Sequence, residues 1–125
     1  MKILLAEDDA PVRELLTAFL SDLGHDVVSV ENGKELITLA LDARPDLVVT
    51  DMHMPEMTGD SMIAMIDLYP PLAGIPVVVV TGATKGELDD FGIPAEIPVI
   101  AKPVDFDKLS AEVEKIAKKY GTPGA

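Results

Sequence analysis

The stretch 46–59 constrains the possible folds of this chain more than any other. It begins with an unbroken apolar run that ends on Asp51, and a loop containing Pro55 and Gly59 follows directly. A short continuous apolar run of this kind is typical of a strand buried on both faces of a sheet. We therefore predict a central strand over 46–50, with Asp51 at its carboxyl end, where open α/β sheets bind their ligands.

Short apolar runs and helical patterns alternate along the rest of the chain. Further strands are predicted at 2–6, 26–30, 76–80 and 99–101. Apolar residues at helical spacing predict helices from Pro11 to Leu23, from Lys34 to Ala43, around Met62 to Tyr69, and from Phe106 to Tyr120. Alternation of this kind with right-handed crossovers predicts an α/β fold, a flavodoxin-like doubly wound sheet of five parallel strands in the order 2-1-3-4-5.

Two helices carry specific expectations. One apolar stripe is predicted on the first helix, formed by Val12, Leu15, Leu16, Phe19, Leu20 and Leu23. The fourth helix is expected to be short or irregular, because glycines and prolines interrupt 85–98. We also hypothesise that 83–97 is mobile. At 125 residues the chain has the length of one domain, expected at 1–120 with a flexible tail or linker start at 121–125.

Composition excludes several classes of function. Ten basic residues against 22 acidic ones give a net charge of −12, which argues against binding to nucleic acid or to an anionic membrane. The absence of cysteine excludes disulfides, thiolate nucleophiles and zinc fingers. The apolar run at the N-terminus is too short for a signal peptide and no run is long enough to span a membrane, so we expect a cytoplasmic protein.

Polar residues follow the carboxyl ends of several predicted strands. Glu7 and Asp8 follow the first strand and Asp51 the third, while Thr81 and Lys102 follow the fourth and fifth. In the predicted strand order all of these ends meet at one rim of the sheet. Each residue alone has an ordinary structural explanation, such as a capping hydroxyl or a surface lysine. Their convergence on one rim favours a functional site.

A cluster of carboxylates at this rim calls for a cation. Oxygen ligands of this type suit Mg²⁺, and Mn²⁺ as well, whereas the lack of cysteine and of histidine at ligand spacing makes zinc a poor fit. The side chain of His53 is expected to face solvent. A carboxylate beside a metal, a hydroxyl and an ammonium group can accept a phosphoryl group, with Asp51 as nucleophile and with Thr81 and Lys102 holding the product phosphate.

Four motifs together resemble a response regulator receiver domain, the phosphoacceptor module of two-component signalling. The segment 4–9 is similar to the family's acidic motif, and 51–59 to its phosphorylation loop. Thr81-Gly82 resembles its switch hydroxyl with a small neighbour, and Lys102-Pro103 its lysine followed by a cis-proline bond. The resemblance covers 2–120.

The resemblance implies roles for individual residues. Asp51 takes a phosphoryl group from a histidine kinase or a histidine phosphotransfer protein. Asp8 and Asp51 bind Mg²⁺ directly, together with the backbone carbonyl of His53, and Glu7 assists through water. Catalysis is limited to the chain's own phosphorylation and slow dephosphorylation, so it is not an enzyme acting on an outside substrate. Output is by contact with a downstream protein, and homodimers are compatible with the family.

Two departures from the family pattern concern output. Val99 stands where the family has an aromatic switch residue, and the irregular fourth helix belongs to the family's common output face. Two other functions remain as alternatives. One is a receiver-like interaction module that is never phosphorylated, and the other is a metal-dependent phosphatase. The complete set of motif residues argues against the first, and short loops without a substrate-enclosing insertion argue against the second.

Overall fold

Strands and helices alternate over 2–50 and over 77–119, as predicted. A computed structural model of the chain describes residues 1–52, 61, 64, 74–82, 84–93 and 96–119. Its elements are β1 (Lys2–Ala6), α1 (Ala10–Asp22), β2 (Asp26–Val30), α2 (Gly33–Ala43), β3 (Leu47–Thr50), β4 (Val77–Thr81), α4 (Lys85–Phe91), β5 (Val99–Ala101) and α5 (Phe106–Lys119). Within the helix predicted around Met62 to Tyr69 the structure describes Ala64 alone, which is helical, and Tyr120 and the tail 121–125 lie outside the described residues.

The five strands form one parallel sheet in the order β2-β1-β3-β4-β5. This confirms the predicted flavodoxin-like arrangement, in which β1 and β3 are central neighbours. The register pairs Ala6, the last residue of β1, with Thr50, the last residue of β3. The residues that immediately follow these two strands therefore emerge side by side at the carboxyl rim of the sheet.

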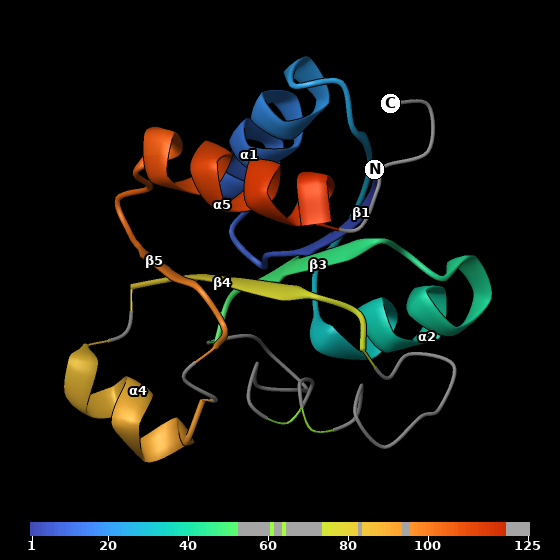
Figure 1. Cartoon of the computed structure of the whole chain (residues 1–125). Helices are drawn as coiled ribbons and strands as arrows, with labels where there is room; N and C mark the ends of the chain where they lie inside the picture. Colours follow the sequence, from blue (N-terminus) through green and yellow to red (C-terminus); the bar gives the residue numbers. More distant parts are fainter. Residues whose placement is uncertain (53–60, 62–63, 65–73, 83, 94–95, 120–125) are drawn as a thin grey trace.

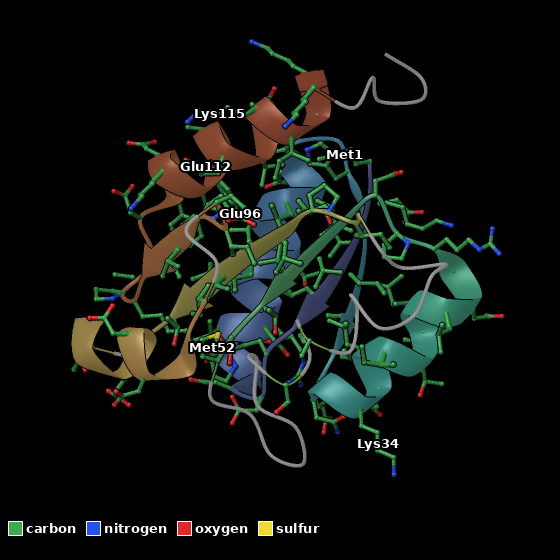
Figure 2. All side chains as sticks on the ribbon, turned by 60° about the horizontal axis from the view of Figure 1, so that its bottom comes forward. Met1, Lys34, Met52, Glu96, Glu112 and Lys115 are labelled. Carbon is green, nitrogen blue, oxygen red and sulfur yellow. The ribbon has the colours of Figure 1, made fainter. Side chains whose placement is uncertain are left out.

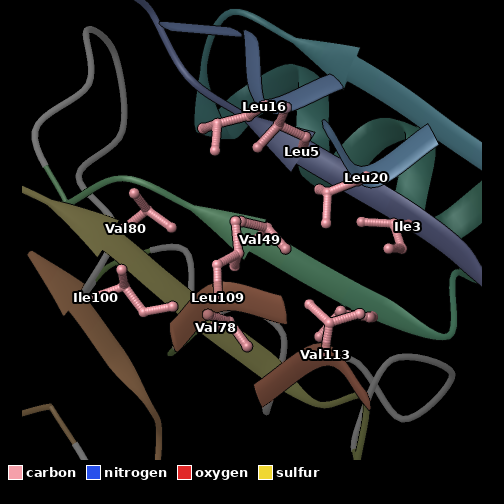
Figure 3. Close-up of a cluster of buried hydrophobic side chains, with 11 residues drawn as sticks. Ile3, Leu5, Leu16, Leu20, Val49, Val78, Val80, Ile100, Leu109 and Val113 are labelled. Atoms are coloured by element: carbon pink, nitrogen blue, oxygen red, sulfur yellow. The ribbon is translucent and has the colours of Figure 1, made fainter. Parts of the chain in front are cut away.

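Helices cover both faces of the sheet. Figure 1 shows α1 and α5 on one face and α2 on the other. The core under α1 and α5 contains Ile3, Leu5, Leu16, Leu20, Leu47, Val49, Val78, Val80, Ile100, Leu109 and Val113, most of them labelled in Figure 3. Leu4 and Ala6 belong instead to the core on the α2 face. Because successive strand residues point to opposite faces, a sheet covered on both sides requires the unbroken apolar runs seen in the sequence.

One residue of the apolar stripe predicted for α1 does not belong to the core. Leu16 and Leu20 are buried, but Leu15 is 56% exposed. Residues adjacent in a helix differ by about 100° in direction, so a stripe centred on Leu16 and Leu20 leaves Leu15 at its edge. The helical spacing identified the correct face of α1 and overestimated its width.

The fourth helix is short, as expected. Helix α4 has seven residues and begins with a capping box, in which the Thr84 hydroxyl accepts a hydrogen bond from the Glu87 amide and the Glu87 carboxylate accepts one from the Thr84 amide. Gly92 ends the helix with a φ of 66°, a conformation that glycine adopts without strain. The mobility of 83–97 stays a prediction. No helix in the described part of the chain is long and apolar enough to cross a bilayer.

His25 and the N-terminus meet at the end of the sheet opposite the carboxyl rim. Met1 precedes β1, and Met52 follows the end of β3. Figure 2 shows these two residues at opposite ends of the sheet. The Met1 ammonium lies 3.0 Å from His25 Nδ1, and because an ammonium can only donate, Nδ1 accepts. The other ring nitrogen, Nε2, is buried and has no hydrogen-bond partner among the described residues. Burial, and then the positive charge of the N-terminus, lower the pKa of His25, and Glu114 opposes them.

We expect acid to destabilise the protein through His25. A histidine whose pKa is lowered by folding binds its proton more readily in the unfolded chain, so its contribution to stability is complete above pH 6.5 and is lost as the pH falls through the lower pKa of the folded state. Urea unfolding of the wild type and of His25→Gln at pH 7.5, 6.5 and 5.5 measures this. The wild type should lose more stability on acidification than the variant, by less than about 1.4 kcal/mol per pH unit, the limit for one proton. Equal losses of unfolding free energy in the wild type and in His25→Gln would refute this role of His25.

Candidate functional site

The sheet fixes the backbone of the residues at its carboxyl rim. The Asp51 amide donates to the Ala6 carbonyl at 3.2 Å, and the Glu7 amide donates to the Val30 carbonyl at 3.1 Å. The Lys102 amide donates to the Thr81 carbonyl at 2.9 Å. These bonds continue the strand ladders by one residue, so the polar side chains start from positions set by the sheet rather than by free loops.

Three carboxylates converge at this rim. Each of Glu7, Asp8 and Asp51 offers an oxygen, and these oxygens all lie within 4.8 Å of one another. Glu7 and Asp51 are buried, whereas Asp8 is exposed. Two unit charges 4 Å apart interact by about 4 kcal/mol at an effective dielectric constant of about 20, so a cluster of this kind is unfavourable without positive charge beside it.

Lys102 supplies part of that charge. Its Nζ donates to Asp51 Oδ2 at 2.8 Å and also to Glu7 Oε1. The lysine side chain is 22% exposed, while the side chains of Glu7 and Asp51 are 1% and 7% exposed. One ammonium group therefore joins two buried carboxylates that come from different strands of the sheet.

The surroundings shift the pKa values of this group. Burial raises the pKa of Glu7, and the nearby charge of Asp51 adds to this, while the hydrogen bond from Lys102 works in the opposite direction. For Lys102, burial favours the neutral amine, but the hydrogen bonds to Asp51 and Glu7 outweigh it and raise the pKa of the ammonium. Lys102 is therefore charged at neutral pH, and the net effect on Glu7 is a raised pKa, which favours the protonated carboxyl group.

Asp51 is oriented through both of its oxygens. Oδ1 accepts a hydrogen bond from the Met52 amide at 2.6 Å, and Oδ2 accepts the one from Lys102. Thr81 is buried and ends β4, which lies between the strands that carry Asp51 and Lys102. A carboxylate held in this way has a fixed orientation at the rim.

The structure brings together most of the residues predicted for the site. Glu7, Asp8, Asp51 and Lys102 form one cluster of charges, and Thr81 ends the strand between β3 and β5. His53, expected to contribute its backbone carbonyl, lies outside the described residues. The peptide bond between Lys102 and Pro103 is cis, as the resemblance implied.

The donor set fits a hard divalent cation. Three carboxylate groups offer oxygens within one small region, two of them buried and one open to solvent. Mg²⁺ and Mn²⁺ bind carboxylate oxygens and retain water ligands, so an exposed carboxylate such as that of Asp8 at the edge of the cluster suits them. Lys102 already occupies one oxygen each of Glu7 and Asp51, which leaves a carboxylate cluster that is only partly neutralised.

Sequence reasoning missed two features of the site. It assigned Lys102 to a phosphate and Glu7 to a metal, and it did not foresee that these two side chains bind each other. It also passed over Arg13, whose Nη1 donates to the carbonyl of Glu7 at 2.9 Å and more weakly to that of Asp8 at 3.4 Å. The available signal was a basic residue in the first turns of the helix that follows the acidic loop, residues 7–9.

Comparison with known proteins gives the same family over nearly the whole chain. The model of the response regulator receiver domain matches residues 3–114. The chain is 27% identical over 125 residues to the phosphate regulon transcriptional regulatory protein PhoB of Pseudomonas aeruginosa, covering 98% of this chain and 53% of PhoB. It is 32% identical over 115 residues to the transcriptional regulatory protein GlrR of Escherichia coli, covering 90% of this chain and 25% of GlrR.

A solved structure shows the same likeness. The signal receiver domain of a signal transduction histidine kinase from Syntrophus aciditrophicus superposes with a TM-score of 0.86 at 28% identity, covering 94% of this chain and 90% of that one. The curated relatives are longer, and this chain spans about half of PhoB and a quarter of GlrR. The likeness therefore concerns one domain of those regulators.

Proposed function

This chain belongs to the response regulator receiver domain family, and from that premise we propose that it accepts a phosphoryl group on Asp51 and signals by contact with another protein. The observation that carries the proposal is the single cluster formed by Asp51, Glu7, Asp8 and Lys102 at the carboxyl rim of the sheet. A buried nucleophile held by a lysine beside two further carboxylates is the arrangement that Mg²⁺-dependent phosphoryl transfer to a carboxylate requires.

Each side chain has a role in the proposed transfer. An oxygen of Asp51 attacks phosphorus, and the bond from phosphorus to the donor breaks as the acyl phosphate forms. Glu7, Asp8 and Asp51 would hold Mg²⁺, together with the backbone carbonyl of His53 by family resemblance. When bound, Mg²⁺ neutralises negative charge on the phosphoryl oxygens.

Lys102 and Thr81 would then hold the new phosphoryl group. The ammonium of Lys102 contacts Asp51 Oδ2, so it is close enough to contact a phosphoryl group attached to that oxygen. The Thr81 hydroxyl is at the end of the adjacent strand, and Gly82 beside it carries no side chain, with nothing within 4 Å of where a Cβ would lie. The group that now stabilises the unmodified carboxylate would thus be reused for its phosphorylated form.

The partners follow from the family and remain proposals. Receiver domains take phosphate from histidine kinases, so the donor for this chain would be such a kinase or a histidine phosphotransfer protein. PhoB and GlrR are described as transcriptional regulatory proteins, and this chain covers only part of each. We propose that its output is protein contact, that it turns over no outside substrate, and that it works in the cytoplasm.

Intact-mass spectrometry with acetyl phosphate tests the proposal. The purified protein should gain one labile phosphoryl group in the presence of Mg²⁺ or Mn²⁺, and a chelator added beforehand should prevent the gain. The same sample, titrated with Mg²⁺ and followed by the NMR signals of residues 7, 8 and 51, shows separately whether the cation binds. Phosphorylation without any divalent cation would contradict the proposed chemistry.

A second result would favour a different function. If the folded protein binds Mg²⁺ but gains no phosphoryl group from acetyl phosphate or from histidine-phosphorylated donors, the non-phosphorylated interaction module becomes the better description. Continuous hydrolysis of a small phosphate ester, with turnover well above the decay of the acyl phosphate, would instead support a phosphatase.

A further inference from the structure

Arg13 reaches back from α1 to the loop that carries two of the three clustered carboxylates. Its Nη1 lies 2.9 Å from the carbonyl oxygen of Glu7 and 3.4 Å from that of Asp8. The side chain is half-buried, and the backbone of Arg13 is fixed in the first turns of the helix by its amide, which donates to the Asp9 carbonyl at 2.8 Å. The guanidinium therefore connects a rigid helix to the backbone of the acidic loop.

The two carbonyl groups that Arg13 contacts lie just past the end of the sheet ladder. The Ala6 carbonyl accepts a hydrogen bond from the Asp51 amide, and the Glu7 amide donates to the Val30 carbonyl, so the sheet ladder ends at the Glu7 amide and the carbonyls of Glu7 and Asp8 lie beyond it. Asp9 is the N-cap of α1, yet its side chain makes no capping hydrogen bond. The Asp9 amide instead donates a hydrogen bond to Glu7 Oε2 at 3.3 Å. This bond links the start of the helix to a carboxylate of the site.

We propose that Arg13 is a positioning residue, which holds the backbone of Glu7 and Asp8 so that their carboxylates converge with Asp51 before a cation binds. The inference rests on the proposed function, because it assigns the converged carboxylates to a cation. A guanidinium suits this task since it stays charged and its planar group can serve two neighbouring acceptors. Its charge also offsets part of the repulsion within the acidic loop.

Preorganisation of this kind acts on cation affinity and leaves the chemical step unchanged. Without Arg13 the loop must be ordered when the cation binds, so part of the binding free energy is lost. At saturating Mg²⁺ the cation itself orders the loop, and phosphorylation should approach the wild-type rate. A residue needed for phosphoryl transfer itself would give the opposite pattern, with a rate that Mg²⁺ does not restore.

The test compares Arg13→Met and Arg13→Lys with the control Arg44→Met. Methionine retains helix propensity in α1, and Arg44 is an exposed arginine at the other end of the sheet, so its replacement removes the same charge far from the site. In metal-free protein, NMR measures hydrogen exchange of the Asp9 amide. The Mg²⁺ dissociation constant is measured by titration, and phosphorylation by acetyl phosphate is followed at limiting and at saturating Mg²⁺.

The expected results separate position from charge. Arg13→Met should speed exchange at Asp9 and weaken Mg²⁺ binding, each by about three- to tenfold, and Arg44→Met should change both by less than about twofold. Arg13→Lys keeps the charge but lacks the planar guanidinium, so its Mg²⁺ affinity should lie nearer to that of Arg13→Met than to that of the wild type. Phosphorylation of all variants should agree within about twofold at saturating Mg²⁺.

Several outcomes would overturn the inference. If Arg13→Met kept the wild-type exchange rate at the Asp9 amide and the wild-type Mg²⁺ affinity, Arg13 would not position the acidic loop. Full affinity in Arg13→Lys would reduce the role of Arg13 to its charge. If the wild type binds no Mg²⁺, the proposed function fails, and exchange of the Asp9 amide in the metal-free proteins still decides whether Arg13 holds the loop.

Discussion

Asp51→Asn is expected to lower phosphoryl uptake from acetyl phosphate by about 100-fold or more, since it removes the proposed nucleophile. An amide oxygen does not attack phosphorus at a useful rate, and the side chain directly after β3 then has no carboxylate oxygen. The variant should stay folded. Asparagine can still accept the Met52 amide, which Asp51 Oδ1 accepts at 2.6 Å, and the loss of one negative charge relieves repulsion in the cluster.

Asp46→Asn is the matched control. Asp46 precedes β3 as Asp51 follows it, and its exposed carboxylate accepts the Lys2 amide at 2.8 Å at the other end of the sheet. The two variants change the net charge equally and involve the same strand. Intact mass at several times after addition of acetyl phosphate should show normal uptake in Asp46→Asn. If Asp51→Asn took up phosphoryl groups at the wild-type rate, the acceptor would be another residue, and the proposed role of Asp51 would be wrong.

Lys102→Met is expected to have the next largest effect, and on two properties at once. In metal-free protein it leaves the buried carboxylates of Glu7 and Asp51 without the ammonium that joins them. Removing one partner of a buried ion pair typically costs several kcal/mol, and because Lys102 is 22% exposed we expect a loss of about 2–4 kcal/mol in the free energy of unfolding. Phosphoryl uptake should also fall by about tenfold or more, through loss of a cation at the transferring group.

Mg²⁺ should restore the stability of Lys102→Met but not its phosphorylation. A divalent cation can neutralise the carboxylates that the lysine leaves behind, so urea unfolding in Mg²⁺ should narrow the difference from the wild type. Mg²⁺ affinity should not fall, because the variant lacks an ammonium that competes for Glu7 and Asp51. Lys108→Met is the control, because Lys108 is exposed and its Nζ contacts, among the described residues, only the Val99 carbonyl, at 3.3 Å.

The outcomes for Lys102 are distinguishable. Normal stability with poor phosphorylation would mean that the contacts to Glu7 and Asp51 add little to folding and that Lys102 serves the transfer alone. Phosphorylation of Lys102→Met at the wild-type rate at saturating Mg²⁺ would show that phosphoryl transfer does not need Lys102. Equal effects in Lys102→Met and Lys108→Met would show a general response to lost charge.

Local sequence patterns determined most of the fold. Unbroken apolar runs such as 77–80 indicated strands buried on both faces, Pro11 marked the start of α1, and the glycines and prolines within 85–98 indicated that α4 is short. These signals are reliable because each depends on the backbone and on a few neighbouring residues. Alternation of strands and helices, with the handedness of crossovers, then restricted the order of the strands.

The sequence by itself also determined which residues reach the carboxyl rim, because every residue that directly follows a parallel strand emerges there. Only the tertiary structure decided which of them touch. Lys102 pairs with Glu7, 95 positions away, and with Asp51, and Arg13 turns back onto the loop before its own helix. The exposure of Leu15 was decided in the same way, by the width of the covered face of α1. Periodicity reports the direction in which a side chain leaves its own strand or helix, whereas contacts across the fold depend on the register of strands and the reach of long side chains, which no local pattern encodes.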